Sequence, residues 1–375
     1  RLGTTGQTGT VQFSGGNESF KWNHATVRFE MTDTLYSSGW LRAESGLQTT
    51  GTVAASNIGT ITPYQWDDFK TSDSVVDVAH GGTNAATAAG ARLNLQTGFA
   101  FDVKGYGAVG DGVTDDRAAI QAAIDAAIAV RGGDVVFPPT ATGSYALSSV
   151  NPTDPACHLR LNYARKIRLI GWGAKLKSLT SDTTIMRITG GSDDCAIYGL
   201  RFDRSTTATS TGNGIEFYNW YTQDRCHFKS VYITKQYHGL YTSSMAGSSS
   251  WDSCWFVDNE ADGAYMPKAA DEYFVSCSFM NNGRNGLTYG GEPGEIGLGA
   301  LHLANCTFYG SGNDDVHIEG YDDESMAFGA YFTNCQSDSA SRYGLYVKNA
   351  QGIQWHGIIG WADSHAIYID NNVKE

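Results

Sequence analysis

Charged residues are scarce in this chain of 375 residues. Asp, Glu, Lys and Arg make up 17% of it, and the formal net charge is −13. Binding to nucleic acid or to an anionic membrane surface needs clustered Lys and Arg, so neither partner is expected. No run approaches the roughly 20 apolar residues of a membrane helix. The first residues lack an initiator Met and the apolar segment of a secretory signal, so we expect no such signal and a fragment or processed piece of a longer chain.

The seven cysteines include no Cys-x-x-Cys pair, and their number is odd. Zinc sites and disulfide frameworks usually show paired spacings, so no metal, cofactor or full set of disulfides is expected. The acidic run 322–324 is interpreted as a solvated turn rather than a calcium site. What the chain has instead is 45 glycines and 12% aromatic residues, which is typical of a turn-rich β protein.

Composition divides the chain into three parts. Residues 1–70 combine Gly, Thr and Ser with scattered aromatics and short alternating runs, which predicts a small β-rich region. Residues 71–98 contain adjacent glycines followed by an Ala-rich segment, which predicts a connector. Residues 99–375 make the third part, and only its entry, 99–147, carries a helical pattern.

The entry segment predicts a strand, a Gly-Asp-Gly turn and one amphipathic helix. Thr114 is a suitable N-cap, and Asp115 and Asp116 suit the first helical turn, where the helix dipole favours negative charge. Isoleucines recur every four residues through the helix and give it one apolar face. A single helix that opens a β chain is expected to cap the end of a solenoid. We therefore interpret Asp111, Asp115 and Asp116 as structural rather than catalytic.

Self-similar segments fill the rest of the chain, at intervals of roughly 23 to 31 residues, as in solenoid proteins. One element of the repeat is a cysteine, found at Cys195, Cys226, Cys254, Cys277, Cys306 and Cys335. A second element is a short strand, as in His238-Gly239-Leu240-Tyr241 and Asp262-Gly263-Ala264-Tyr265. We expect one copy per coil, with small or aliphatic residues inward, polar or aromatic residues outward, and the cysteines stacked as one buried column. The predicted fold is all-β: a right-handed parallel β-helix capped by one helix.

The outward positions of the second repeated strand form one face, with tyrosines interrupted by carboxylates. Aromatic rings can stack on the apolar faces of sugars, and carboxylates can accept hydrogen bonds from hydroxyl groups, so this face predicts a polysaccharide groove. The alternative is that Tyr is simply favoured in strands. The predicted substrate-binding residues are Glu216, Tyr241, Tyr265, Arg284, Glu292, Tyr346 and Lys348.

The predicted catalytic residues are Asp262, Asp315, His317 and Glu319. Glycoside hydrolysis needs two carboxyl groups, about 6.5–9.5 Å apart for inversion and about 5–5.5 Å for retention. Asp262 and Asp315 are expected at matching places two coils apart, beside His317 and Glu319 on one strand. Elimination from a uronic acid is the competing chemistry, with Arg284, His317, Arg342 and Lys348 in the same region.

Two segments resemble known families. The pattern of residues 81–95 is similar to a segment of phage tail fibres and tail spikes, and 99–147 resembles the entry of the pectate-lyase-like right-handed β-helices. The resemblance implies a phage tail spike on the virion, extracellular and homotrimeric, attached to baseplate or tail proteins through residues 1–70. Such a protein would bind and depolymerise bacterial capsule or O-antigen, most often by paired carboxylates. The alternatives are a non-enzymatic receptor-binding or structural tail protein and a free polysaccharide lyase or hydrolase.

Overall fold

The computed structural model describes residues 10–12, 19–23, 28–31, 100–205, 209–218, 225–243, 246–290, 299–321, 326–370 and 373–374. The chain divides into two units, Arg1–Ser72 and Asp73–Glu375. In the first unit, β1 (Thr10–Gln12), β2 (Ser19–Asn23) and β3 (Arg28–Met31) form an antiparallel sheet. The predicted connector, Glu292 and the acidic run 322–324 lie outside the described residues.

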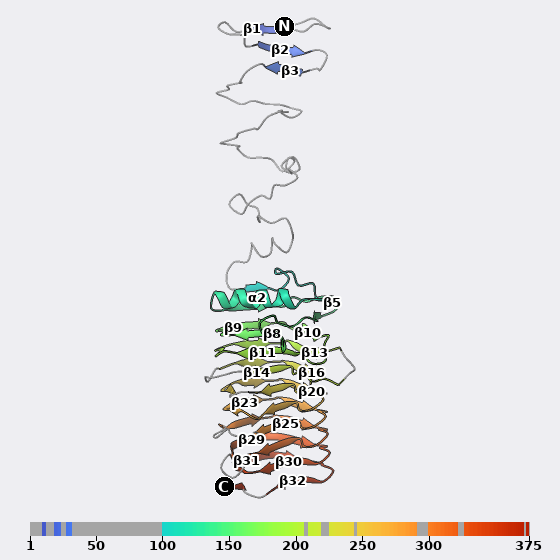
Figure 1. The fold of residues 1–375 in the computed structure, drawn as a ribbon, viewed down its shortest axis with the longest axis vertical. Coiled ribbons are helices and arrows are strands. Elements are labelled where there is room, and N and C mark those ends of the chain that lie inside the picture. The colour runs from blue at the N-terminus through green and yellow to red at the C-terminus, as the bar shows by residue number, and fades with distance from the viewer. Residues whose placement is uncertain are drawn as a thin grey trace. The chain divides into compact units, whose positions relative to one another are not determined.

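The second unit confirms the predicted parallel β-helix (Figure 1). One side of each coil belongs to a sheet with nine described strands, all parallel to their neighbours. These strands are β8 (Cys157–Asn162), β11 (Thr184–Thr189), β14 (Ile215–Tyr218), β17 (Leu240–Thr242), β21 (Ala264–Met266), β25 (Leu287–Gly290), β28 (Val316–Glu319), β30 (Tyr343–Lys348) and β32 (His365–Ile369).

The remaining sides of the coils belong to a sheet with nineteen described strands. In chain order they are β4 (Ala100–Asp102), β5 (Asp111–Asp115), β6 (Gly133–Val136), β7 (Ser144–Leu147), β9 (Ile167–Ile170), β10 (Lys175–Ser178), β12 (Ala196–Tyr198), β13 (Arg201–Arg204), β15 (His227–Lys229), β16 (Tyr232–Thr234), β19 (Ser250–Asp252), β20 (Trp255–Val257), β23 (Glu272–Val275), β24 (Ser278–Met280), β26 (Leu301–Ala304), β27 (Thr307–Tyr309), β29 (Ala327–Asp338), β31 (Ala350–Ile359) and β33 (Val373–Lys374). A small separate pair joins β18 (Ala246–Gly247) to β22 (Ala269–Ala270).

Aromatic residues stack inside the coils as well as outside. Phe256, Phe279 and Phe308 lie in register on successive strands, with ring centroids 4.8 Å apart at each step. Phe228 and Trp251 stack at 3.7 Å in a second interior column. The expectation that aromatics face outward is therefore wrong for these positions, because the interior is wide enough to hold rings that repeat at the strand spacing.

All seven cysteines are buried and unbonded, but the six that were predicted to stack form two columns rather than one. Cys195 and Cys226 precede the paired strands β12 and β15. Cys254, Cys277 and Cys306 directly precede β20, β24 and β27, and Cys335 lies at the corresponding place within β29. The first column continues instead through Ser249 and Glu272. Two bends in each coil accept the same small side chain, so the spacing of cysteines along the sequence could not distinguish one column from the other.

The capping helix α2 (Arg117–Ala129) buries Ile120 and Ile124 against the first coils, and Ile128 is partly buried. The N-cap is Asp116 and not Thr114, which lies in β5. The Asp116 carboxylate accepts hydrogen bonds from the backbone N–H groups of Val109 and Gly110, so it holds the preceding turn. The prediction that Asp115 and Asp116 lie in the first helical turn is wrong, because Asp115 belongs to β5 and Asp116 precedes the helix. None of the described helices is long and apolar enough to cross a membrane.

Candidate functional site on the nine-stranded sheet

The predicted outward face of the nine-stranded sheet is confirmed by the strand register. One column runs through Arg160, Arg187, Glu216, Tyr241, Tyr265, Thr288, His317, Tyr346 and Tyr368. Gly290, Glu319 and Lys348 follow one another in the next outward column. The alternation of strand side chains thus places His317 and Glu319 on the same side of β28.

Asp262 and Asp315 do not occupy matching places. Because Ala264 and Val316 share one inward column through Leu287, the residue that corresponds to Asp262 is Asp314. Asp315 instead falls in a column of glycines, where a Cβ on Gly286 would lie 2.5 Å from the Asp315 backbone oxygen. Its carboxylate is fully buried and accepts hydrogen bonds from Ser337 and the Ser311 backbone. Burial raises the pKa of Asp315 to about 6 despite these bonds, and the side chain does not reach the outer face.

A linked set of polar side chains surrounds His317. Its Nδ1 lies 2.7 Å from the Asp314 carboxylate and its Nε2 lies 3.0 Å from the Glu319 carboxylate. Lys348 Nζ donates to the other Glu319 oxygen at 2.9 Å, and Arg342 pairs with Asp314. We call these five residues the Asp314 cluster.

The side chains of the Asp314 cluster range from fully buried to partly exposed. Asp314 has no exposed surface, His317 is 15% exposed, Glu319 28%, Lys348 37% and Arg342 39%. Burial acts to raise the pKa of Asp314, but hydrogen bonds from Arg342 and His317 outweigh it, so that pKa is lowered. The pKa of Glu319 is also lowered, because hydrogen bonds from Lys348 and His317 outweigh its partial burial. Both carboxyl groups are therefore ionised near neutral pH.

Two coils earlier, a second set forms the Asp262 cluster: Asp262, His238, Tyr241, Tyr265 and Arg284. Asp262 is fully buried and pairs with Arg284, which lies over the Tyr265 ring at 5.0 Å. His238 is also buried, and desolvation lowers its pKa to about 4. This imidazole is neutral near pH 7. Asp262 and Arg284 thus pair with each other, and neither belongs to the His317 set.

The tyrosine rings stack on each other along the sheet. Tyr241 and Tyr265 are parallel within 2° at 5.6 Å, and Tyr346 lies between His317 at 4.5 Å and Tyr368 at 5.6 Å. Rings stacked in this way cover each other's faces. The face-on stacking of sugars expected from the sequence is therefore not available at Tyr265 or Tyr346, and the ring edges and charged groups are what this face exposes.

Glu216, another predicted substrate-binding residue, is almost completely buried and pairs with Arg187. Arg187 also pairs with Asp154 and lies over the ring of Tyr218. Sequence reasoning missed Asp314 as a member of the site. Aligning the repeats on their inward aliphatic residue, Val316 in this coil, would have placed Asp314 opposite Asp262. No group of three or more His, Cys, Asp or Glu side chains that could hold a metal ion occurs in the described part of the chain.

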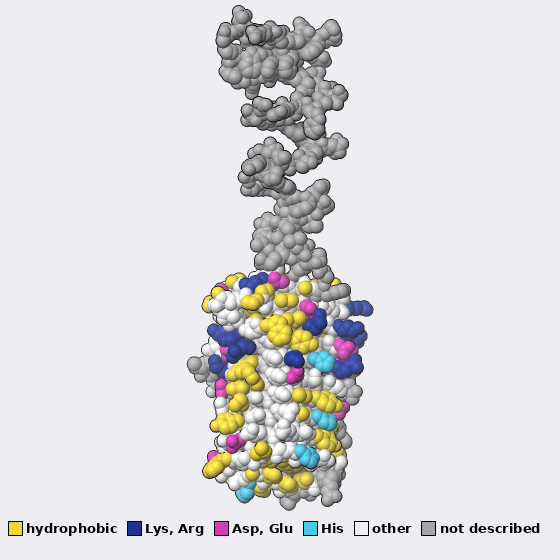
Figure 2. Space-filling model, turned by 180° about the vertical axis from the view of Figure 1, so that it is seen from behind, with side chains coloured by type: hydrophobic (Ala, Val, Ile, Leu, Met, Phe, Trp, Pro, Cys, Tyr) yellow, Lys and Arg dark blue, Asp and Glu magenta, His cyan; other side chains and the backbone are white. Residues whose placement is uncertain are grey.

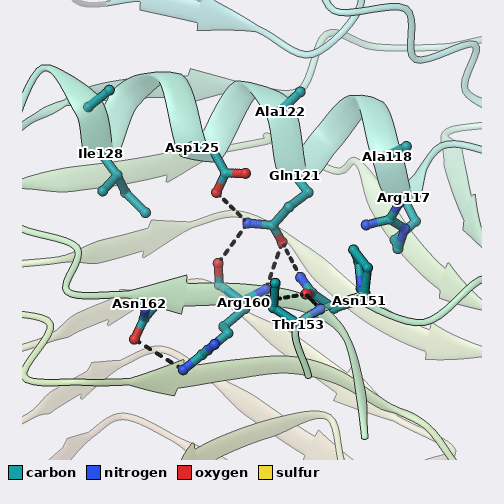
Figure 3. Close-up of a pocket in the computed structure, with 12 residues that line it drawn as sticks. Arg117, Ala118, Gln121, Ala122, Asp125, Ile128, Asn151, Thr153, Arg160 and Asn162 are labelled. Carbon is teal, nitrogen blue, oxygen red and sulfur yellow. Dashed lines mark hydrogen bonds between the residues drawn. The ribbon is translucent and has the colours of Figure 1, made fainter. Parts of the chain in front are cut away.

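A cavity of about 550 Å³ lies elsewhere on the molecule, between α2 and β8 (Figure 3). His317 is six strands away along the nine-stranded sheet. Its lining contains no histidine and one carboxylate, Asp125, so the linked histidine and carboxylates of the Asp314 cluster have no counterpart in this cavity.

Curated proteins match short parts of the chain. Mannuronan C5-epimerase AlgE6 of Azotobacter vinelandii is 54% identical over 63 residues, which is 16% of this chain and 7% of that protein. Mannuronan C5-epimerase AlgE4 of the same bacterium is 38% identical over 93 residues, 25% of this chain and 14% of that protein. The chain therefore corresponds to a small fraction of the length of these relatives.

Solved structures share the fold. The structure of Geobacillus virus E2 ORF18 has a TM-score of 0.52 at 17% identity, covering 96% of this chain and 61% of that chain. A tailspike protein, gp49 of Acinetobacter baumannii bacteriophage Fri1, described as a capsular polysaccharide depolymerase, has a TM-score of 0.50 at 12% identity, covering 74% and 58%. At these identities the likeness concerns the fold, and it agrees with the predicted right-handed parallel β-helix.

A family model described as "Rhamnogalacturonase A/epimerase, pectate lyase-like" matches residues 100–337. The match takes in the capping helix and, of the Asp314 cluster, Asp314, His317 and Glu319, whereas Arg342 and Lys348 lie beyond its end. Because it covers more than half of the chain, the chain belongs to the rhamnogalacturonase A/epimerase, pectate lyase-like family.

Proposed function

We propose that the nine-stranded sheet binds an acidic bacterial polysaccharide and that His317 removes the proton next to a sugar carboxylate. The outcome is elimination or epimerisation of a uronic acid. The observation that carries the proposal is the position of His317, whose two ring nitrogens lie on two carboxylates beside two cations.

The geometry supports a directed proton transfer. The buried Asp314 carboxylate accepts from Nδ1–H and so fixes the ring, which leaves Nε2 to exchange a proton at the accessible end of the cluster. With both nitrogens on carboxylates, the imidazole donates from both only when it is protonated. Loss of the Nε2 proton then gives the base.

Arg342 and Lys348 supply the second requirement. A carbon-bound proton becomes acidic when the neighbouring carboxylate is neutralised, because negative charge then develops on the carboxylate oxygens. Both cations lie at the exposed end of the cluster and are held by carboxylates that a substrate could replace in part. This arrangement favours an anionic substrate.

Glycoside hydrolysis, the chemistry first predicted from the sequence, is the second candidate, because the family description names a rhamnogalacturonase. Its general acid must hold a proton near neutral pH. Asp315 has the raised pKa but faces the interior, whereas Glu319 is accessible and has a lowered pKa. The Asp314 cluster thus suits proton abstraction better than paired-carboxylate hydrolysis.

We further propose that the protein is a phage tail spike on the virion surface, a homotrimer joined to tail or baseplate proteins through its N-terminal unit. The resemblance of residues 81–95 to tail-fibre segments supports this role. The shared fold of a phage tailspike is compatible with it. A receptor-binding protein without enzymatic activity is the outcome that the assay below separates.

The test uses the full chain in D2O with mannuronan, polygalacturonate and neutral dextran. We expect deuterium at the carbon next to the carboxylate, or the ultraviolet absorbance of an unsaturated uronate, with an acidic polymer only. New reducing ends without either signal would show hydrolysis, and binding without any change would show a receptor-binding protein.

The matched variants are His317→Gln and His302→Gln. His302 stacks between Tyr273 and Tyr331 on the nineteen-stranded sheet, so its replacement makes a similar change away from the cluster. We expect the first variant to lose exchange and the second to keep it. Equal exchange in both would remove His317 from the reaction.

A further inference from the structure

We propose that the cavity between α2 and β8 is a distal subsite for an acidic sugar of the polysaccharide that the Asp314 cluster modifies. The ligand is a sugar unit with a carboxylate and neighbouring hydroxyl groups. This inference takes from the proposed function that the ligand is an acidic polysaccharide. It does not depend on the reaction proposed at His317.

The cavity has one wall from the helix and one from the first coil. Arg117, Gln121 and Asp125 point from α2 toward β8, and Arg160 and Asn162 come from the outer face of that strand (Figure 3). The alanines of the helix add an apolar surface, which suits the C–H face of a pyranose ring. Convergent polar groups beside an apolar surface can fix the orientation of a bound ligand.

Gln121 holds the two walls in a fixed position. Its side-chain oxygen accepts from the Arg160 backbone N–H at 2.9 Å and from the Asn151 amide at 3.1 Å. Its amide donates to the Arg160 carbonyl at 3.0 Å and to Asp125 at 2.8 Å. The side chain of Gln121 is therefore fully used, and the cavity is held open by the fold itself.

Arg160 gives the cavity an uncompensated positive charge. It donates to the Thr189 hydroxyl at 3.1 Å and to the Asn162 side-chain oxygen at 3.2 Å, which are both neutral. Its neighbour in the same column, Arg187, pairs with Asp154 and Glu216. No carboxylate pairs with Arg160 among the residues that the structure describes, and three of its five N–H donors have no acceptor there.

The donors left over define the class of ligand. The amide N–H groups of Asn162 also lack a protein acceptor within the described ranges, because only its oxygen is used. Asp125 is the single carboxylate in the lining, against the two arginines Arg117 and Arg160. A surplus of donors and one net positive charge call for a ligand rich in acceptor oxygens with one negative charge. A uronate fits both, and its hydroxyl groups can donate to Asp125.

The cavity and the Asp314 cluster lie on one sheet face. Arg160 on β8 and His317 on β28 belong to the same outward column, six strands apart. At about 4.8 Å per strand the separation is about 29 Å. A polysaccharide that follows the column can reach both places, so occupation of the cavity would hold the chain while the cluster acts on a unit further along.

The test measures equilibrium binding of mannuronate and galacturonate oligomers of increasing length, with His317→Gln as the background so that no turnover occurs. Affinity should rise steeply once an oligomer is long enough to span the two places. In Arg160→Gln on this background we expect the long oligomers to bind about tenfold more weakly, the loss of one charge-assisted hydrogen bond. Ala122→Trp, which fills the cavity from an exposed helix position, should give the same loss.

Arg165→Gln is the matched control, because Arg165 is exposed, lies near the same strand and is absent from the cavity lining. Unchanged binding of long oligomers in both cavity variants would overturn the subsite, even if the wild type modifies uronates. If the wild type modifies none, but the cavity variants still weaken oligomer binding relative to Arg165→Gln, the subsite stands and the proposed reaction fails. Equal displacement by sulfate and by a uronate monomer would show a general anion site and would also overturn the proposal.

Discussion

In the Asp262 cluster and in the Asp314 cluster, two coils apart, a fully buried aspartate accepts hydrogen bonds from an arginine of the following coil. The residue three positions after each aspartate stands in the same outward column, and it is Tyr265 in one cluster and His317 in the other. Tyr265 is covered by Tyr241 and Arg284, whereas His317 has both nitrogens on carboxylates.

The comparison separates scaffold from chemistry. The aspartate–arginine pair recurs because a buried carboxylate at this bend needs a charged partner, whichever ring follows it. What distinguishes the Asp314 cluster is a ring that can carry a proton and a second carboxylate, Glu319, where the Asp262 cluster has none in the corresponding position. A repeated frame can thus carry a reactive group in one coil and a packed ring in another.

Exchange of the two rings should give the largest effect. We expect His317→Tyr to lower kcat/KM for an acidic polysaccharide by about 10²–10⁴-fold, because a general base is removed. Tyr265→His should change it by less than about fivefold, since a transition-state contact is not involved there. Both are measured by deuterium exchange into the polymer, with circular dichroism to confirm folding. A similar loss in the two variants would show that the clusters act as one site.

The next largest effect is expected on stability, at a buried carboxyl group that has no cationic partner among the described residues. Glu272 lies in the interior, accepts from Trp251 Nε1 at 3.0 Å, and has a pKa raised to about 8 by burial. Its folded-state pKa exceeds the unfolded value of 4.5, so stability falls as the pH rises between these values, by roughly 3–5 kcal/mol in total. Glu272→Gln should remove that part of the pH dependence in urea unfolding at pH 5 and pH 8. Parallel curves for the two proteins would contradict the assignment.

The shared frame should respond equally in the two clusters. Arg284→Gln and Arg342→Gln each leave a buried aspartate without its cation, and we expect each to lower the free energy of unfolding by roughly 1–3 kcal/mol, less than for a fully buried pair because both arginines are partly exposed. Adding Asp262→Asn to the first variant, or Asp314→Asn to the second, should restore part of the stability. A difference of more than about 2 kcal/mol between the single variants would mean that the frames are not equivalent.

Replacement of Glu319 should give the smallest effect on the free energy of unfolding. The pH dependence of its contribution should have the opposite sign to that of Glu272. Its folded-state pKa is lowered, so the stability that it contributes is present above pH 4.5 and is lost as the pH falls through the folded-state pKa. Because Glu319 is partly exposed, we expect the contribution to be below about 1 kcal/mol. Acid unfolding of Glu319→Gln against the wild type measures it, and a gain in stability near neutral pH would show that the Lys348 pair is unfavourable.

The sequence predicted the face of the nine-stranded sheet better than it predicted the site. The positions of Tyr241, Tyr265, His317 and Tyr346 in one outward column follow from strand alternation, and the structure agrees. The choice of Asp315 over Asp314 failed because the two are adjacent aspartates, and only the neighbouring coils show which one occupies the glycine position.

The sequence by itself determined the repeat, the capping helix and the outward column of the nine-stranded sheet, because these depend on local periodicity and on small residues at tight bends. The tertiary structure alone decided which coils align. That alignment separated the cysteines into two columns, covered the faces of the tyrosine rings and joined Asp314 to Arg342. The physical reason is that coils of unequal length must still pair strand to strand, so the contacts between coils are set by backbone hydrogen bonds across the stack and not by distance along the chain.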